Sequence, residues 1–89
     1  MKFKTSQGML SLKELIWKCE FRDFKSYKYE EIYFYGYESY FITVSISKKS
    51  GLRLLRLTTD LGIEIYRFTG DLAKELDKMI RKNYPEVLL

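Results

Sequence analysis

Cys19 and the adjacent acids Glu30 and Glu31 are the side chains in this sequence that come nearest to a catalytic arrangement. A cysteine or serine nucleophile is normally activated by histidine, and the chain contains no histidine. Cys19 falls on the apolar stripe of a predicted helix, where a cysteine acts as a small buried hydrophobe. Glu30 and Glu31 are neighbours in a predicted strand, so they point to opposite faces and do not form an acid–base pair. We therefore expect no catalytic residues and no enzyme activity.

Metal and cofactor sites are equally unsupported by the residue types present. With one cysteine and no histidine, a zinc site would have to consist mostly of carboxylates. Residues 58–62 (TTDLG) do not match a calcium-binding loop, and the sequence has no glycine-rich phosphate-binding motif. We expect no metal and no cofactor.

The aromatic and basic residues favour binding instead. Residues 28–41 read KYEEIYFYGYESYF, and half of these side chains are aromatic. Tyrosine, tryptophan and arginine contribute much of the energy of protein interfaces, and rings beside lysine or arginine also suit single-stranded nucleic acid. The candidate partner-binding residues are Trp17, Arg22, Lys28, Tyr29, Tyr33, Tyr35, Tyr37, Phe41, Lys48, Lys49, Arg53 and Arg56.

Residues 28–35 alternate as a strand would, and we expect Ile32 and Phe34 to face the core. The opposite, outward face would carry Tyr29, Tyr33 and Tyr35. Tyr37 falls in the following turn. An alternative stays open, in which these rings form a second small core under the N-terminal strand, residues 21–24 or the C-terminal tail. A homodimer through the open sheet face would also bury them.

The clearest local signal marks the start of a helix. Ser11 followed by Glu14 is a capping box, which predicts that the helix begins at Ser11 or Leu12. Its apolar stripe, at i, i+3, i+4 and i+7, consists of Leu12, Leu15, Ile16 and Cys19. We expect this helix to end within residues 20–27, which then pass into a loop. Residues 1–5 suit a short strand.

Four strands are expected, in residues 28–35, 40–47, 52–59 and 63–68. The second strand alternates most cleanly and turns Tyr40, Ile42, Val44 and Ile46 inward. Its other face carries Phe41, Thr43, Ser45 and Ser47, and we expect Arg53 or Arg56 beside them. The third strand changes phase, which predicts a bulge or burial on both faces.

The fourth strand is expected to turn two residues inward, Ile63 and Ile65. A last helix begins near Thr69, and its apolar stripe consists of Leu72, Leu76, Met79 and Ile80. Asp77 and Arg81 are spaced for an i, i+4 ion pair. Asn83 is expected to end this helix in the left-handed conformation.

These elements predict one α+β domain over residues 1–89. The fold is a four-stranded antiparallel meander flanked by an N-terminal and a C-terminal helix, both packed on one sheet face. The amphipathic pattern of both helices requires an apolar surface to cover, and the inward residues of the meander supply it.

The net charge of +4 and the pI of about 9.2 favour an acidic partner, which could be nucleic acid, a membrane surface or a protein. No apolar run approaches the ~18 residues that a membrane span needs, so we expect no membrane-spanning segment. Among the acidic partners we expect a protein or a nucleic acid and no membrane. A single cysteine and the absence of a signal peptide favour the cytoplasm.

We interpret the sequence as a small non-catalytic protein that binds a protein partner. Its composition is similar to that of accessory proteins of phages and mobile elements, some of which inhibit host nucleic-acid-processing proteins such as CRISPR effectors. The alternative is single-stranded nucleic-acid binding through a tyrosine- and lysine-rich sheet face. Four strands followed by a helix resemble, in layout alone, a family of small single-strand-binding transcription cofactors.

Overall fold

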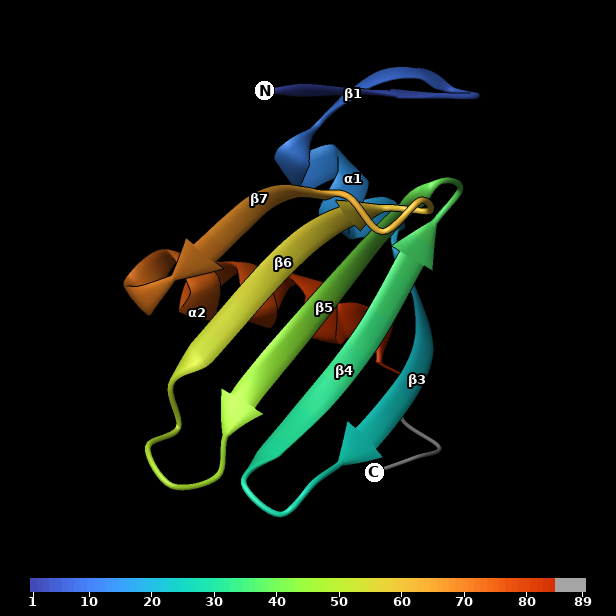
Figure 1. The fold of residues 1–89 in the computed structure, drawn as a ribbon. Helices are drawn as coiled ribbons and strands as arrows, with labels where there is room; N and C mark the ends of the chain where they lie inside the picture. The colour runs from blue at the N-terminus through green and yellow to red at the C-terminus, as the bar shows by residue number, and fades with distance from the viewer. Residues whose placement is uncertain (85–89) are drawn as a thin grey trace.

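Two antiparallel sheets and two α-helices make up residues 1–84, the part of the chain that the computed structural model describes (Figure 1). A two-stranded sheet pairs β1 (Lys2–Thr5) with β2 (Gly8–Ser11). The five-stranded sheet consists, in spatial order, of β3 (Glu20–Ser26), β4 (Glu30–Tyr37), β5 (Tyr40–Ser47), β6 (Arg53–Thr59) and β7 (Glu64–Thr69). The helices are α1 (Leu12–Lys18) and α2 (Gly70–Ile80), and α2 runs into a 3₁₀ turn, η1 (Arg81–Asn83). The α+β class is confirmed.

The predicted four-stranded meander is matched only in part, because β3 adds a fifth strand where a helix end and a loop were expected. Phe21 lies opposite Tyr35 and Phe24 lies opposite Tyr33, so both phenylalanines share one face although they are three residues apart. Arg22 is the extra residue of a bulge between them. This bulge interrupts the period of two, which is why the sequence pattern gave no strand signal here.

Helix α1 begins as its sequence predicts. The Ser11 side chain accepts a hydrogen bond from the Glu14 backbone N–H (3.2 Å), and the Glu14 carboxylate accepts one from the Ser11 N–H (3.0 Å). Leu15, Ile16 and Cys19 are buried, as expected. At the other end, the Asn83 amide donates to the carbonyl oxygens of Ile16 and Cys19 and so caps α1. The predicted left-handed role of Asn83 is wrong, because this residue lies in η1.

Both helices pack on the same face of the large sheet (Figure 1). We call it the helix-covered face. Its centre is formed by buried aliphatic residues of two strands, Ile42, Val44, Leu55 and Leu57. The helices add Leu15, Ile16, Ala73, Leu76 and Ile80, and β1 adds Phe3. Burying this apolar surface supplies most of the driving force for folding.

The tyrosines of β4 also belong to the helix-covered face. Tyr33 lies opposite Val44, and Tyr35 lies opposite Ile42. Residues directly opposite one another in an antiparallel pair share a face, and Tyr35 is accordingly only 1% exposed. The predicted assignment is therefore wrong, and Ile32 and Phe34 occupy the other face. The sequence predicts the alternation of β4 correctly but assigns its two faces the wrong way round. Both sets of alternating residues are largely apolar or aromatic, so hydrophobicity alone does not show which set faces the core.

The last strand and helix depart from the expected pattern in a similar way. Ile63 precedes β7 and is 60% exposed, which contradicts its predicted inward position. Ile65 is the extra residue of a second bulge and packs partly against the core. In α2, Leu76 and Ile80 are buried as predicted, whereas Leu72 is exposed. The expected C-terminal tail lies outside the described residues.

Cys19 is expected to resist thiol reagents in the native protein. Its side chain is 1% exposed, and burial raises the pKa of the thiol to about 12, so the reactive thiolate is scarce at neutral pH. Reaction with Ellman's reagent at pH 8 should be at least about 100-fold slower in the native protein than in urea. A native thiol that reacts as fast as the unfolded one would contradict this placement.

Tyr35 provides a test of the corrected face assignment. Its hydroxyl is buried and has no hydrogen-bond partner within the described residues. Tyr35→Phe should therefore keep the free energy of unfolding or raise it by up to about 1 kcal/mol. Tyr35→Ala should lower it by about 3–5 kcal/mol, because a large cavity opens in the core. Urea titrations of both variants measure the free energy of unfolding. A Tyr35→Ala protein as stable as the wild type would contradict the buried position of this ring.

Candidate functional site

The face of the large sheet that points away from α1 and α2 is not covered by any helix of the described residues (Figure 1). We call it the open face. Strand register assigns its side chains, since each lies opposite another member across a neighbouring strand. Its principal members are Lys25, Ile32, Phe34, Phe41, Thr43, Ser45, Ser47, Leu54, Arg56, Thr58 and Arg67.

Side-chain size falls along the central strand β5 of the open face. From one end to the other the outward residues are Phe41, Thr43, Ser45 and Ser47, as the sequence predicted. The two serines are too short to fill the space between their taller neighbours. A groove of about 640 Å³ lies over them, between the β3–β4 and β5–β6 connections. Its walls include Tyr29, Leu52, Leu54 and Arg56.

At the opposite end of β5, the side chains of Phe41 and Arg22 meet above Gly36. A Cβ atom built on Gly36 would lie 3.1 Å from Arg22 Nε and 3.1 Å from Phe41 Cδ1, so a side chain there would displace both groups. The bulge in β3 directs Arg22 toward this position, with its guanidinium 3.5 Å from the Gly36 carbonyl oxygen. Phe41 remains 38% exposed. Because Gly36 has no side chain, it leaves room for an aromatic ring and a guanidinium to lie together on the open face.

The structure separates the candidate residues that the sequence had grouped. Three lie on the open face or against it: Arg22, Phe41 and Arg56. Four lie in the connections at the groove end: Lys28, Tyr29, Lys48 and Lys49. Four lie on the helix-covered face: Tyr33, Tyr35, Tyr37 and Arg53. Trp17 projects from α1, is 62% exposed, and has the Lys82 ammonium 5.2 Å from its ring centroid.

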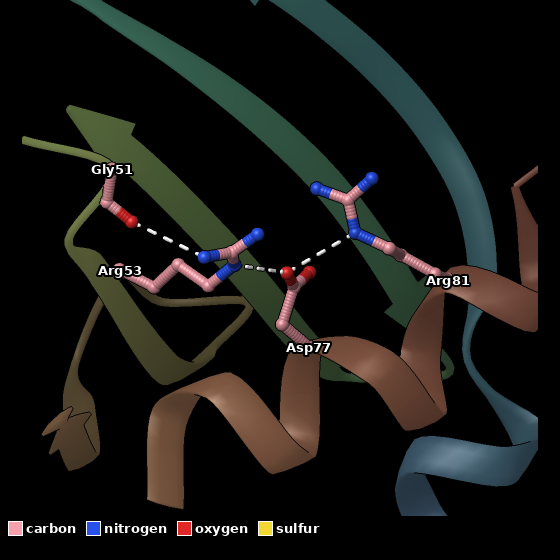
Figure 2. Close-up of polar contacts among 4 residues, drawn as sticks. All are labelled: Gly51, Arg53, Asp77 and Arg81. Atoms are coloured by element: carbon pink, nitrogen blue, oxygen red, sulfur yellow. Dashed lines mark hydrogen bonds and ion pairs between the residues drawn. The ribbon is translucent and has the colours of Figure 1, made fainter. Parts of the chain in front are cut away.

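Of the two arginines of which one was expected beside the outward residues, Arg56 lies there opposite Thr43, whereas Arg53 has a structural partner on the other face. It lies opposite Ile46, and its Nε donates to the Asp77 carboxylate at 2.6 Å (Figure 2). Arg81 Nε donates to the same oxygen at 3.1 Å, which confirms the predicted i, i+4 pair. Asp77 is only 2% exposed, so it needs these two cations to offset the loss of water.

Tyr33 belongs to an aromatic cluster on the helix-covered face. The rings of Phe24 and Tyr84 lie 4.8 Å and 5.6 Å from its own, and the Arg81 guanidinium lies 5.2 Å from its centroid. Burial raises the pKa of the Tyr33 hydroxyl above its usual range. Phe21, which lies 4.8 Å from Tyr84, completes the cluster. The alternative of a second core under residues 21–24 across the outward face is therefore not what forms, because these residues are a strand of the same sheet and their two rings extend the main core on the helix-covered face.

Sequence reasoning missed several members of the open face because it had assigned them to the core or not assigned them. They are Ile32, Phe34, Leu54 and Arg67. The signal that could have found them is the cleaner alternation of residues 40–47. Once Ile42 and Val44 are placed inside, the strand partners of Thr43 and Ser45 must be outside.

The chemistry available on the open face is that of hydrogen bonding, ion pairing and aromatic contact. Within residues 1–84, no group of three or more cysteine, aspartate or glutamate side chains is placed to hold a metal ion. No helix among these residues is long and apolar enough to cross a membrane. Comparison with known protein families, curated proteins and solved structures finds no match to this chain.

Arg53 and Arg56 are expected to differ in what they contribute to stability. Arg53→Ala removes one of the two cations that pair with buried Asp77 and should lower the free energy of unfolding by about 1–3 kcal/mol. Arg56→Ala removes the same charge from an exposed position and should change it by no more than about 0.5 kcal/mol. Equal losses in urea titrations of the two variants would contradict the structural role of Arg53.

Proposed function

We propose that this chain is a small non-catalytic binding protein that recognises a protein partner through the open face of its sheet. The observation that carries the proposal is a five-stranded sheet whose two helices lie on one side, with exposed Phe41 and Arg56 on the other. Aromatic and arginine side chains are the types enriched at the centres of protein interfaces, and this uncovered face carries both.

The edges of the sheet are less suited to binding than its face. Both edge strands carry a bulge, at Arg22 in β3 and at Ile65 in β7. A bulge interrupts the row of free backbone donors and acceptors to which another strand could pair. Partner recognition by adding a strand is therefore disfavoured, and side chains of the open face remain as the means of recognition.

The charge of the chain supports an acidic partner surface, since +4 attracts negative charge over about a Debye length. We propose that the partner is a nucleic-acid-processing protein of a host, and that the chain inhibits or modulates it in the cytoplasm, as some accessory proteins of phages and mobile elements do. A compact, basic, histidine-free sequence supports this part of the proposal.

Single-stranded nucleic-acid binding is the second candidate, and the placement of Phe34 and Phe41 near Lys25 and Arg56 favours it. The sequence argument for this candidate relied on Tyr33 and Tyr35 facing outward, whereas both rings are turned toward the helices. The Lys25 ammonium lies 5.6 Å from the Phe34 ring centroid and competes with a base for that ring. Stacking by successive bases requires exposed ring faces, so a protein partner is the better-supported function.

Affinity capture from the source cell, with and without nuclease, tests the proposal when it is done with matched variants. Phe41→Asp places a charge on the open face, and Trp17→Asp places the same charge on an exposed aromatic position of α1. A stoichiometric, nuclease-resistant protein should be captured by the wild type and by Trp17→Asp. Phe41→Asp should weaken its binding at least about 10-fold, which is the loss of one interface anchor.

Both variants must first show cooperative urea unfolding with midpoints high enough that each is fully folded under the capture conditions. Capture that disappears with nuclease would support the nucleic-acid candidate instead. Recovery of a second copy of this chain alone would assign the open face to a homodimer. Capture that Trp17→Asp abolishes and Phe41→Asp preserves would overturn the proposed surface.

A further inference from the structure

We propose that the groove at the serine end of the open face binds an extended, acidic segment of the partner protein. This inference rests on the proposed function and specifies where on the open face the partner is anchored and by which chemistry. The groove lies along the central strand β5, over Ser45 and Ser47. The β3–β4 and β5–β6 connections, which lie at the same end of the sheet, flank it on two sides (Figure 1).

The dimensions of the groove suit one extended chain. Neighbouring strands of a sheet are about 4.8 Å apart, so side chains of β4 and β6 are separated across β5 by roughly 10 Å. The groove has a volume of about 640 Å³ and is widely open to solvent, which suits a segment of chain lying on the surface and not an enclosed small molecule. The hydroxyls of Ser45 and Ser47 can each donate and accept a hydrogen bond, which matches the alternating groups of a peptide backbone.

The charges around the groove select a negatively charged segment. Lys28 and Arg56 line it, and Lys49 is exposed in the adjoining connection, whereas Glu30 is the single acid of the lining. Arg53, also at the groove, has its charge engaged by Asp77. Arg56 is 3.9 Å from Glu64 in a half-exposed pair, which leaves its guanidinium available to a second carboxylate.

The floor of the groove favours a peptide over a nucleic acid. On β5 it carries the short side chains of Ser45 and Ser47, so a base would find no ring on the strand beneath it. The rest of the lining is mainly apolar, with Leu52, Leu54, Tyr27 and Tyr29 around the serines. Tyr29 stands at the rim, and the Lys28 ammonium already lies 5.3 Å from its ring centroid. Phe41 lies at the opposite end of β5, six residues from Ser47. Carboxylates spaced along an extended chain meet both the cations and the hydroxyls of this site.

The test is a selection of random twelve-residue peptides against the intact chain, followed by fluorescence polarisation with the selected peptides. We expect enrichment of aspartate and glutamate, and amide chemical-shift changes centred on Ser45 and Ser47. Ser45→Phe, which fills the groove, and Arg56→Gln, which removes a groove charge, should each weaken binding at least about 5-fold. Arg67→Gln is the matched control, since Arg67 lies on the same face and also pairs with Glu64 but does not line the groove. It should change binding less than about 2-fold.

Selected peptides without acidic enrichment, or with shift changes around Trp17, would overturn the proposal. So would a twelve-residue oligothymidine that binds the groove more tightly than the selected peptides and is lost with Arg56→Gln. If Ser45→Phe fails to fold, the difference in peptide affinity between Arg56→Gln and Arg67→Gln still tests whether the groove binds the peptide. Capture of the cellular partner that is lost with Phe41→Asp but unaffected by Ser45→Phe would reject the groove while keeping the open face as the binding surface.

Discussion

The register between β4 and β5 is the constraint on which the rest of this structure depends. Tyr35 lies opposite Ile42, and this pairing turns the tyrosines of β4 toward the helices together with the aliphatic residues of β5 and β6. A shift of one residue would exchange the two faces of the strand. The inward turn of β4 buries the Tyr35 hydroxyl without a partner within residues 1–84. Helix α2 buries Asp77 on the same face, where two arginines pair with its carboxylate.

The same register also decides which side chains lie on the open face. Because the tyrosines and the large aliphatic residues are used on the helix-covered face, the residues that remain on β5 decrease in size from Phe41 to Ser47. One end of the face therefore carries a ring and a guanidinium over Gly36, and the other end is an open groove whose lining combines two serines, two leucines and two tyrosines with cations beside them. The proposed binding function rests on these two ends, an exposed ring at one and a groove at the other.

Much of the fold could be predicted from local signals, and the errors share one cause. The capping box at Ser11, the strand in residues 40–47 and the pair of Asp77 with Arg81 are local patterns, and each is confirmed. Strand β3 was missed because the bulge at Arg22 breaks its period. The outward position was predicted correctly for Phe41 and Arg56, and the predicted face was inverted for Tyr33 and Tyr35. Tyrosine suits either side of a sheet, so only the long-range pairing with β5 decides its direction.

Hydroxyl-radical footprinting of the chain with and without its cellular partner measures most directly whether the open face is the binding surface. The method reports the solvent access of aromatic and sulfur-containing side chains. Phe41 and Tyr29 are exposed on or beside the open face, whereas Trp17 and Met9 are exposed elsewhere. The account predicts that the partner protects Phe41 and Tyr29 and leaves Trp17 and Met9 as reactive as in the free chain. Protection of Trp17 and Met9, with Phe41 still fully reactive, would contradict it.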